Sequence, residues 1–300
     1  MKVLVISGFL GAGKTRFIKE LVRRTRRNFV VLENEYADIG VDGGRLKEDV
    51  SVWELTEGCI CCSVKSDFAA SVLTISNTLA PEFLVVEPTG VGLLSAVLEN
   101  IGRIAYERIE VLSPVALVDI HCFDEYLKTF DAFYADQIRN AGTLLISKAE
   151  NSPPERVAAV AAELRGLNTE ADIPQRHYSE QPQEWWEALL SKPRAGERAF
   201  TDLEGHPELS QVGYSGFTVN TMNEFLLKLQ LLMRGNLGRV YRAKGCFSVQ
   251  GQWASFDLVK DRYAIEPCAP SEESKMVIIG ADLNEKYLHK LFVQNERLFQ

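Results

Sequence analysis

Near the N-terminus, the run 8-GFLGAGKT-15 matches G-x-x-x-x-G-K-[ST], the pattern of a phosphate-binding loop. Its three glycines permit backbone angles that larger residues resist, so successive N–H groups point at phosphate oxygens. The pattern assigns the β- and γ-phosphates to Lys14 and a magnesium ligand to the hydroxyl of Thr15. We therefore predict that a nucleoside triphosphate binds here with Mg²⁺. The residues of this segment predicted to bind the nucleotide are Gly8, Gly11, Ala12, Gly13, Lys14, Thr15 and Arg16.

A carboxylate stands near the end of a later apolar run, 83-FLVVEPTG-90. If that run is a parallel strand, its carboxyl end delivers Glu87 to the phosphate site. We predict that Glu87 binds the metal ion or positions the attacking water, which makes Lys14 and Glu87 the candidate catalytic residues. The turn at Thr89 and Gly90 is expected to sense the γ-phosphate through its backbone. The alternative is that Glu87 caps the following helix.

The segment 143-TLLISKAE-150 ends where a guanine-binding sequence, N-K-x-D, would stand after a strand. Lys148 is expected to lie over the base, and Glu150 to accept hydrogen bonds from the guanine edge. Ser147 replaces the asparagine of the pattern and cannot make all the contacts of an amide. We expect GTP to bind in preference to ATP. The alternative is that the segment is an ordinary polar turn. If ATP binds more tightly, the departures from the pattern at Ser147 and Glu150 would explain it.

Three cysteines occupy four positions in 57-EGCICCSV-64. A tight turn would aim their thiolates at one borderline-soft ion such as Zn²⁺ or Co²⁺. Three thiolates leave a tetrahedral ion one ligand short, which suits a site that passes its metal on. A buried, inert cysteine turn and a redox dithiol are the alternatives. The residues predicted to bind the metal are Cys59, Cys61 and Cys62, with carboxylates such as Glu35 and Asp38 from 33-ENEYADIGVDGG-44.

Apolar runs and helix-like patterns alternate through the first half of the chain, and these elements have to position the loops above. Runs that are apolar throughout are typical of parallel strands covered on both faces. We predict a doubly wound α/β domain over residues 1–190, with its ligands at the carboxyl ends of the strands. The expected strands are 3-VLVIS-7, 29-FVVLEN-34, 83-FLVVEP-88, 114-PVALVD-119 and 143-TLLISK-148, and the expected helices include 16-RFIKELVRR-24 and 65-KSDFAASVLTISNTL-79.

The pattern changes after residue 190. Residues 191–210 are polar and without clean periodicity, and they contain Pro193, Gly205 and Pro207, so we predict a linker. Residues 211–300 favour a smaller α+β domain in which helices pack on one antiparallel sheet. The expected strands there are 211–219, 239–250, 252–259 and 275–280, and the expected helices are 222–234 and 284–292.

The composition argues against several classes of protein. The chain has 300 residues, 46% of them hydrophobic, and its net charge of −8 argues against a nucleic-acid partner. No apolar stretch approaches the roughly 20 residues that cross a bilayer, and the N-terminus lacks the cleavage site of a signal peptide. We therefore expect a cytoplasmic protein without a membrane partner, whose six cysteines are reduced and available as ligands.

Together these motifs resemble those of the CobW-like family of P-loop GTPases, relatives of the urease and hydrogenase nickel-insertion GTPases. The resemblance implies a P-loop GTPase domain, phosphate and Mg²⁺ at Lys14 and Thr15, and transferable metal on the cysteines. It leaves open whether 177-HYSE-180 lines the base pocket or is an ordinary surface turn. The resemblance rests on 8-GFLGAGKT-15, 33-ENEYADIGVDG-43, 58-GCICC-62 and 87-EPTG-90, and in the second half on 241-YRAKGCFSVQG-251 and 277-VIIGADL-283.

The resulting expectation is a GTP-hydrolysing metallochaperone. Residues 33–62 join the phosphate loop to the thiolates, so bound GTP would assemble the metal site and hydrolysis would loosen it. The expected partners are GTP and GDP, a transition-metal or corrinoid cargo, a client metalloprotein and a second copy in a nucleotide-dependent homodimer. The alternatives are a regulatory GTPase with a structural zinc, a small-molecule kinase and an ATP-preferring relative.

Overall fold

The computed structural model shows two compact units, with residues up to Arg194 in the first and residues from Leu209 in the second. The structure describes residues 1–33, 51–54, 65–88, 90, 92–105, 108–194, 209–259 and 262–293. Among these residues, every helix is too short or too polar to span a bilayer.

The first unit is built on a parallel sheet with the strand order β3-β2-β4-β1-β6-β7, in which the short strand β5 also pairs with β1. Every strand pair in it is parallel. The strands are β1 (Lys2–Gly8), β2 (Phe29–Glu33), β3 (Ser51–Glu54), β4 (Phe83–Glu87), β5 (Glu110–Val111), β6 (Val115–Asp119) and β7 (Thr143–Ser147).

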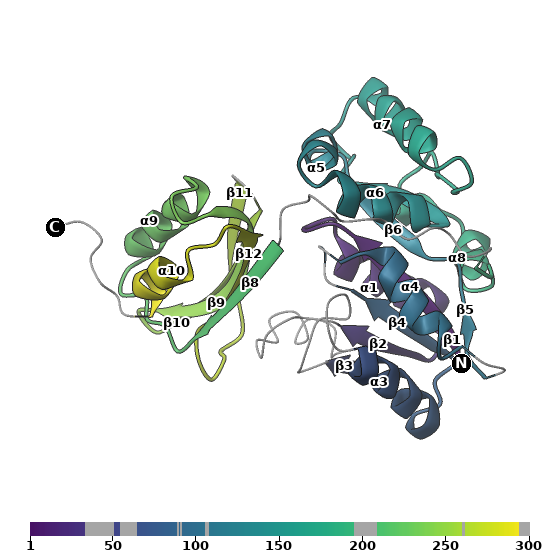
Figure 1. The fold of residues 1–300 in the computed structure, drawn as a ribbon, viewed down its shortest axis with the longest axis horizontal. Coiled ribbons are helices and arrows are strands. Elements are labelled where there is room, and N and C mark those ends of the chain that lie inside the picture. The colour runs from purple at the N-terminus through teal and green to yellow at the C-terminus, as the bar shows by residue number, and fades with distance from the viewer. Residues whose placement is uncertain are drawn as a thin grey trace. The chain divides into compact units, whose positions relative to one another are not determined.

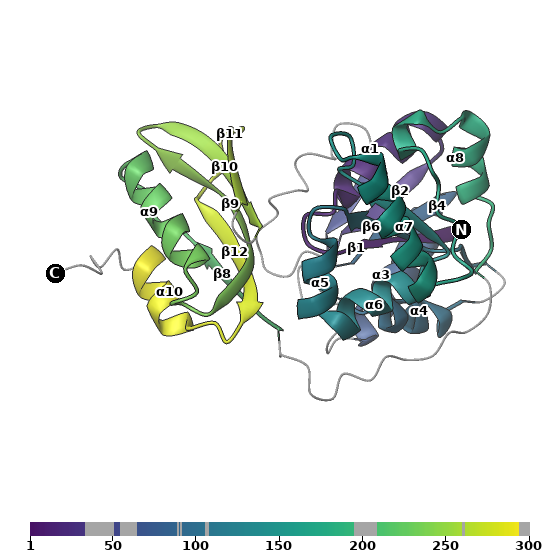
Figure 2. The same ribbon diagram turned by 90° about the horizontal axis from the view of Figure 1, so that it is seen from above.

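Helices cover both faces of this sheet, so its strands are apolar at successive positions (Figures 1 and 2). Helices α1 and α8 lie on one face and α3, α4 and α6 on the other, as Figure 2 shows. Leu4 and Ile6 of β1 join the core under α1, while the alternate side chains of Val3 and Val5 are equally buried. The helical segments are α1 (Lys14–Thr25), α3 (Lys65–Thr78), α4 (Leu94–Gly102), α5 (Phe123–Thr129), α6 (Asp131–Asn140), α7 (Pro154–Leu167), the short η1 (Tyr178–Glu180) and α8 (Gln183–Leu189).

The predicted doubly wound architecture is confirmed. Strand β1 lies between β4 and β6, so the chain crosses to one side of it to reach β2 and to the other side to reach β6 and β7. Ligands of open α/β sheets bind at such a reversal point, outside the carboxyl ends of the strands. The phosphate loop follows β1 directly, and Glu87 ends the neighbouring strand β4.

The second unit is a five-stranded antiparallel sheet with the order β11-β10-β9-β12-β8, and two helices pack against it. The predicted antiparallel sheet with helices packed on it is confirmed, and both helices lie on the same face of the sheet in Figure 1. Phe225 and Leu229 of α9 and Leu288 of α10 join Phe247 and Phe256 of the sheet in one core. The elements are β8 (Leu209–Ser215), α9 (Met222–Met233), β9 (Arg239–Val249), β10 (Gln252–Val259), β11 (Arg262–Pro267), β12 (Lys275–Ala281) and α10 (Glu285–Phe292).

Two parts of the predicted linker, 191–210, belong to regular or hydrogen-bonded structure. The backbone N–H of Ser113 donates to the carbonyl of Lys192, and that of Arg194 donates to the carbonyl of Val111. Strand β8 already begins at Leu209. The last described residues of the first unit are therefore hydrogen-bonded to the segment that contains β5.

Candidate functional site

The loop between β1 and α1 has the backbone conformation that its glycines predict. Gly8, Gly11 and Gly13 have φ angles of 150°, 73° and 93°. Gly13 precedes the helix in the left-handed region, where a residue with a Cβ is strained, and α1 begins at Lys14. The first turn of α1 contains no acidic residue, so the positive end of the helix dipole is not neutralised there. The loop therefore presents the features of an anion-binding turn.

Lys14 is buried within this loop. Its Nζ donates a hydrogen bond of 2.9 Å to the carbonyl oxygen of Gly8, across the loop from the start of the helix. The backbone N–H of Ala12 donates to the carbonyl of Phe9, which closes the turn between them. The ammonium group is thus held at the concave side of the loop by the backbone that the glycines shape.

Thr15 and Glu87 meet at the carboxyl edge of the sheet. The hydroxyl of Thr15 lies 3.3 Å from each carboxylate oxygen of Glu87 and donates to them. The two residues come from α1 and from the end of β4, which are 72 positions apart in the chain. A hydroxyl and a carboxylate so placed are hard oxygen donors, which is the ligand chemistry of Mg²⁺.

Lys148 is held by a carboxylate that the sequence analysis did not single out. It follows β7 in a left-handed conformation (φ 59°), and its Nζ lies 2.7 Å from Oδ2 of Asp119. Asp119 is 4% exposed, ends β6 and also accepts from the backbone N–H of His121. A sequence signal was available, because Asp119 ends the apolar run 114–119 in the same way as Glu87 ends its own strand.

The other two residues predicted to bind the guanine base differ in exposure and in hydrogen bonding. Ser147 is buried, and its hydroxyl donates to the carbonyl of Val118 within the sheet, 3.2 Å away. Glu150 is half exposed, with its carboxylate 3.8 Å from Nε2 of His177. Lys148 and Glu150 therefore offer charged groups at this edge, whereas the Ser147 hydroxyl is engaged with the backbone.

The segment that contains His177 packs beside α1. Tyr178 lies edge-on to Phe17 of α1, with ring centroids 5.1 Å apart, and Arg24 of the same helix donates to the carbonyl of Ser179. Burial raises the pKa of Tyr178, and the positive charge of Arg16 opposes part of that rise. Three separate segments of the sequence thus meet in one region beside the start of α1. They contribute Arg16, Glu150 and His177.

The predicted metal ligands lie outside the described residues. Cys59, Cys61, Cys62, Glu35 and Asp38 all fall in ranges that the structure does not describe. Within the described ranges, no group of three or more histidine, cysteine, aspartate or glutamate side chains is arranged to hold a metal ion. The described cysteines, Cys122, Cys246 and Cys268, are outside any disulfide and have intermediate exposure.

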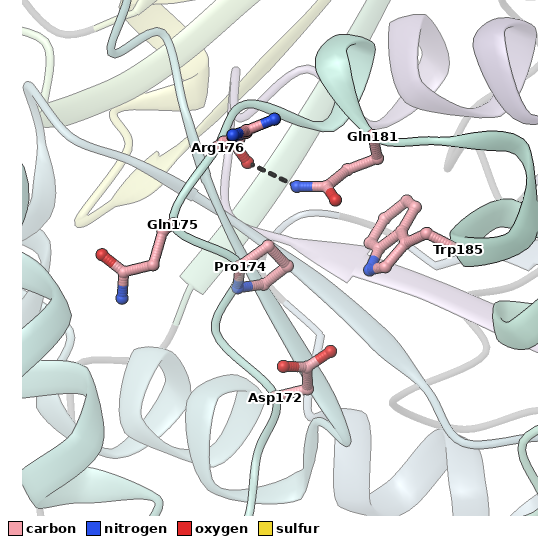
Figure 3. Close-up of a pocket in the computed structure, with 6 residues that line it drawn as sticks. All are labelled: Asp172, Pro174, Gln175, Arg176, Gln181 and Trp185. Atoms are coloured by element: carbon pink, nitrogen blue, oxygen red, sulfur yellow. Dashed lines mark hydrogen bonds between the residues drawn. The ribbon is translucent and has the colours of Figure 1, made fainter.

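An open pocket of about 350 Å³ lies in the segment before α8 and involves none of the predicted site residues (Figure 3). The Gln181 side chain donates to the carbonyl of Arg176 across it, 3.0 Å away. Its lining consists of Asp172, Pro174, Gln175, Arg176, Gln181 and Trp185.

Two family models match the chain. The one described as "CobW/HypB/UreG, nucleotide-binding domain" matches residues 2–175, and the "Cobalamin synthesis protein cobW C-terminal domain" matches residues 217–295. The zinc chaperone YeiR of Escherichia coli is 28% identical over 160 residues, which are 52% of this chain and 49% of YeiR. The zinc chaperone CobW of Sinorhizobium sp is 38% identical over 99 residues, which are 30% of this chain and 28% of that protein.

Among solved structures, the Zn(II)-bound YjiA GTPase from E. coli aligns over 99% of both chains, with a TM-score of 0.48 and 19% sequence identity. The chain spans about half the length of YeiR and a smaller part of the Sinorhizobium protein.

Proposed function

Since this chain belongs to the CobW/HypB/UreG family of P-loop GTPases, we propose that it hydrolyses GTP and uses the cycle to deliver a transition metal to a client protein. Lys14, Thr15 and Glu87 act on the triphosphate, and Cys59, Cys61 and Cys62 hold the metal, with Glu35 and Asp38 as supplementary ligands. The observation that carries the proposal is the contact between Thr15 and Glu87 at the mouth of the phosphate loop.

That contact supports the hydrolytic half of the proposal. The Thr15 hydroxyl and the Glu87 carboxylate are the oxygen donors that would hold Mg²⁺, which when bound neutralises charge on the phosphate oxygens. Lys14 and the N–H groups of the loop bind the phosphates, and the positive end of α1 adds to their attraction. Glu87 also orients the attacking water in this proposal, and its position at the end of β4, the strand that pairs with β1, supports this role.

The order of the strands supports coupling between phosphate and metal. Strand β2 lies between β3 and β4, and Glu33 at the end of β2 is in register with Glu54 of β3 and with Glu87 of β4. The segments that leave β2 and β3 therefore start at the same edge of the sheet as Glu87. Those segments carry Glu35, Asp38 and the three cysteines, so in this proposal a change at the γ-phosphate reaches the metal ligands through segments that start beside Glu87.

The charged groups beyond β7 support a preference for GTP. In this proposal Glu150 accepts from the guanine N1–H and N2–H₂ groups, and adenine offers an acceptor where guanine has its N1–H. Lys148, fixed by Asp119, lies over the base in this proposal. We propose that Arg16, at the start of α1 and beside the segment that contains His177, also binds the nucleotide.

Zn²⁺ is the cargo that we propose first, because two of the matched relatives are named zinc chaperones. Co²⁺ suits the same ligands, and a corrinoid is the further alternative. The thiolates require a reducing compartment, so we propose that the protein acts in the cytoplasm. A client metalloprotein receives the metal, and a nucleotide-dependent homodimer is a proposed step in the cycle.

The test is the affinity for Zn²⁺ of protein without nucleotide, with GDP and with a non-hydrolysable GTP analogue. We expect the GTP form to bind Zn²⁺ more tightly than the GDP form by a factor on the order of a hundred. The variant Lys14→Ala, which lacks the phosphate contact, should show no such difference. Equal affinities in all three forms of the wild type would rule out nucleotide-driven delivery and favour a regulatory GTPase with a structural zinc.

A further inference from the structure

Helix α6 carries two consecutive buried polar side chains that the nucleotide chemistry proposed above does not use. Asp136 is fully buried and Gln137 is 1% exposed. Polar groups so deep in an apolar interior destabilise the fold unless they are hydrogen-bonded. Their partners therefore indicate what the two side chains do.

Gln137 binds the loop that follows Glu87. Its Nε2 donates hydrogen bonds to the carbonyl oxygens of Gly90 and Gly92, at 3.1 and 2.9 Å. Both bonds are buried, and both join α6 to the turn that follows β4. Among the described residues Oε1 of Gln137 has no partner, so the side chain acts through its two N–H groups.

Asp136 holds the end of the same loop. Its Oδ2 accepts from the backbone N–H of Ser95 in the first turn of α4, 3.0 Å away, and Oδ1 accepts from Asn140 one turn along α6. Asp136 and Gln137, which are neighbours on α6, thus form hydrogen bonds with both the loop after β4 and the start of α4. The chain is therefore held to α6 at Gly90, Gly92 and Ser95.

The phosphate loop confines the same segment from the other side. A Cβ added to Gly90 would lie 2.9 Å from the backbone nitrogen of Leu10, closer than real Cβ atoms approach. Leu10 belongs to the phosphate loop, and its carbonyl also accepts a long hydrogen bond of 3.5 Å from the hydroxyl of Tyr126 on α5. Gly90 is therefore packed between Leu10 and the Gln137 amide.

We propose that Gln137 is a positioning residue for GTP hydrolysis: by holding the carbonyls of Gly90 and Gly92, it sets the loop that presents Glu87 to the γ-phosphate. This inference rests on the proposed function and adds to it a residue that touches neither nucleotide nor metal. The two carbonyls accept from one planar amide, so displacing that amide shifts the loop at two points. A shift of about 1 Å in a catalytic group costs on the order of a hundredfold in rate.

The chemistry of the side chain defines the variants. Gln137→Glu keeps the shape but replaces two donors by a carboxylate, which repels the two carbonyls. Gln137→Met keeps the length of the side chain and removes both N–H donors without adding charge. It replaces Gln137→Glu in the experiment if the glutamate variant does not fold. Asn168→Asp is the matched control, because Asn168 is a buried amide that donates to the carbonyls of Ile138, Arg139 and Ala141 at the far end of α6.

The experiment measures steady-state GTP turnover, with kcat and KM separated, and hydrogen exchange of residues 92–98 without nucleotide. For Gln137→Glu and Gln137→Met we expect kcat to fall by at least about tenfold, KM to stay within about twofold, and exchange over residues 92–98 to accelerate. For Asn168→Asp we expect reduced thermal stability with unchanged kcat and unchanged exchange over 92–98.

Unchanged kcat in folded Gln137 variants would overturn the proposal, as would an equal fall of kcat in Asn168→Asp, which would mean that only overall stability matters. The exchange measurement separates this inference from the proposed function. If the wild type proves not to hydrolyse GTP, the proposed function fails. Faster exchange over residues 92–98 confined to the Gln137 variants would still establish that Gln137 holds the loop.

Discussion

The hydroxyl of Thr15 lies 3.3 Å from both carboxylate oxygens of Glu87. The first residue belongs to the helix that follows the phosphate loop and the second to the end of the neighbouring parallel strand. Their contact joins the residue expected to bind Mg²⁺ to the residue expected to orient water, so the chemistry of one depends on the other.

Removing either of these Mg²⁺ ligands should lower turnover and raise the Mg²⁺ concentration that turnover requires. We expect Thr15→Val and Glu87→Gln each to lower kcat for GTP by about a hundredfold or more, because each removes an oxygen donor from the phosphate site. Phosphate release measured over a Mg²⁺ titration checks this. Thr25→Val is the control, since the hydroxyl of Thr25 donates to the carbonyl of Leu21 at the far end of the same helix; a similar loss there would contradict the assignment.

Replacing the loop lysine should remove both tight triphosphate binding and hydrolysis. Lys14→Ala deletes the ammonium that the loop holds at its concave side, and we expect turnover to fall by about a thousandfold. Calorimetric titration with GTP and a phosphate-release assay measure the two effects. Lys19→Ala removes an exposed lysine from the same helix and should behave as wild type. Normal turnover in Lys14→Ala would discredit the phosphate-loop interpretation.

Asp119 should influence affinity for the base rather than the rate of hydrolysis. In Asp119→Asn the ion pair with Lys148 is lost, and we expect GTP to bind about tenfold more weakly while kcat changes little. Calorimetry with GTP and ATP measures the affinity and the preference between them. The control Asp124→Asn removes an exposed carboxylate that pairs with Arg156. An unaltered GTP affinity in Asp119→Asn would show that Lys148 does not need this partner.

The cysteine motif should bind metal independently of nucleotide binding. We expect Cys61→Ala to abolish tight binding of Zn²⁺ and Co²⁺ while GTP affinity stays near that of wild type, because a thiolate ligand is lost and the phosphate loop is unchanged. Competition with a chelating dye measures the metal. Cys268→Ala, which removes a partly exposed thiol of the second unit, is the control. Retention of stoichiometric, high-affinity metal by Cys61→Ala would count against the site.

A pH effect on stability is expected from Glu20 on α1. Hydrogen bonds from Arg23 and then Arg24 lower the pKa of Glu20 from 4.5 to about 2, although partial burial opposes this. A carboxylate whose pKa is lowered on folding stabilises the protein above its unfolded pKa, and this contribution is lost as the pH falls from about 4.5 through about 2.

Glu20→Gln should therefore lower the free energy of unfolding at pH 7 by no more than about 1 kcal/mol, the range of solvent-screened ion pairs. The difference from wild type should vanish near pH 2. Urea denaturation followed by tryptophan fluorescence measures it, because Trp186 packs on Phe17 of the same helix. Glu163→Gln, at an exposed position of α7, is the control; a difference that persists at pH 2 would exclude the ion pairs as its cause.

Some elements could be predicted because a local pattern specifies them. The continuous apolar runs gave five of the parallel strands, and Gly13 followed by Lys14 marks the start of α1. Strands β3 and β5 were missed, since four and two residues carry too short a pattern to distinguish from a loop. These two segments form strands because they pair with neighbouring strands, and their own residues show no strong preference for β-structure.

The residues predicted to bind phosphate can be named from the sequence by itself, because spacing along one turn and one helix start fixes their geometry. The partners of those residues do not. The pairing of Thr15 with Glu87, of Lys148 with Asp119 and of Gln137 with the loop at Gly90 joins segments 29 to 72 positions apart. Strand order brings such segments together, and it is set by the burial of both faces of the sheet, which no single segment encodes.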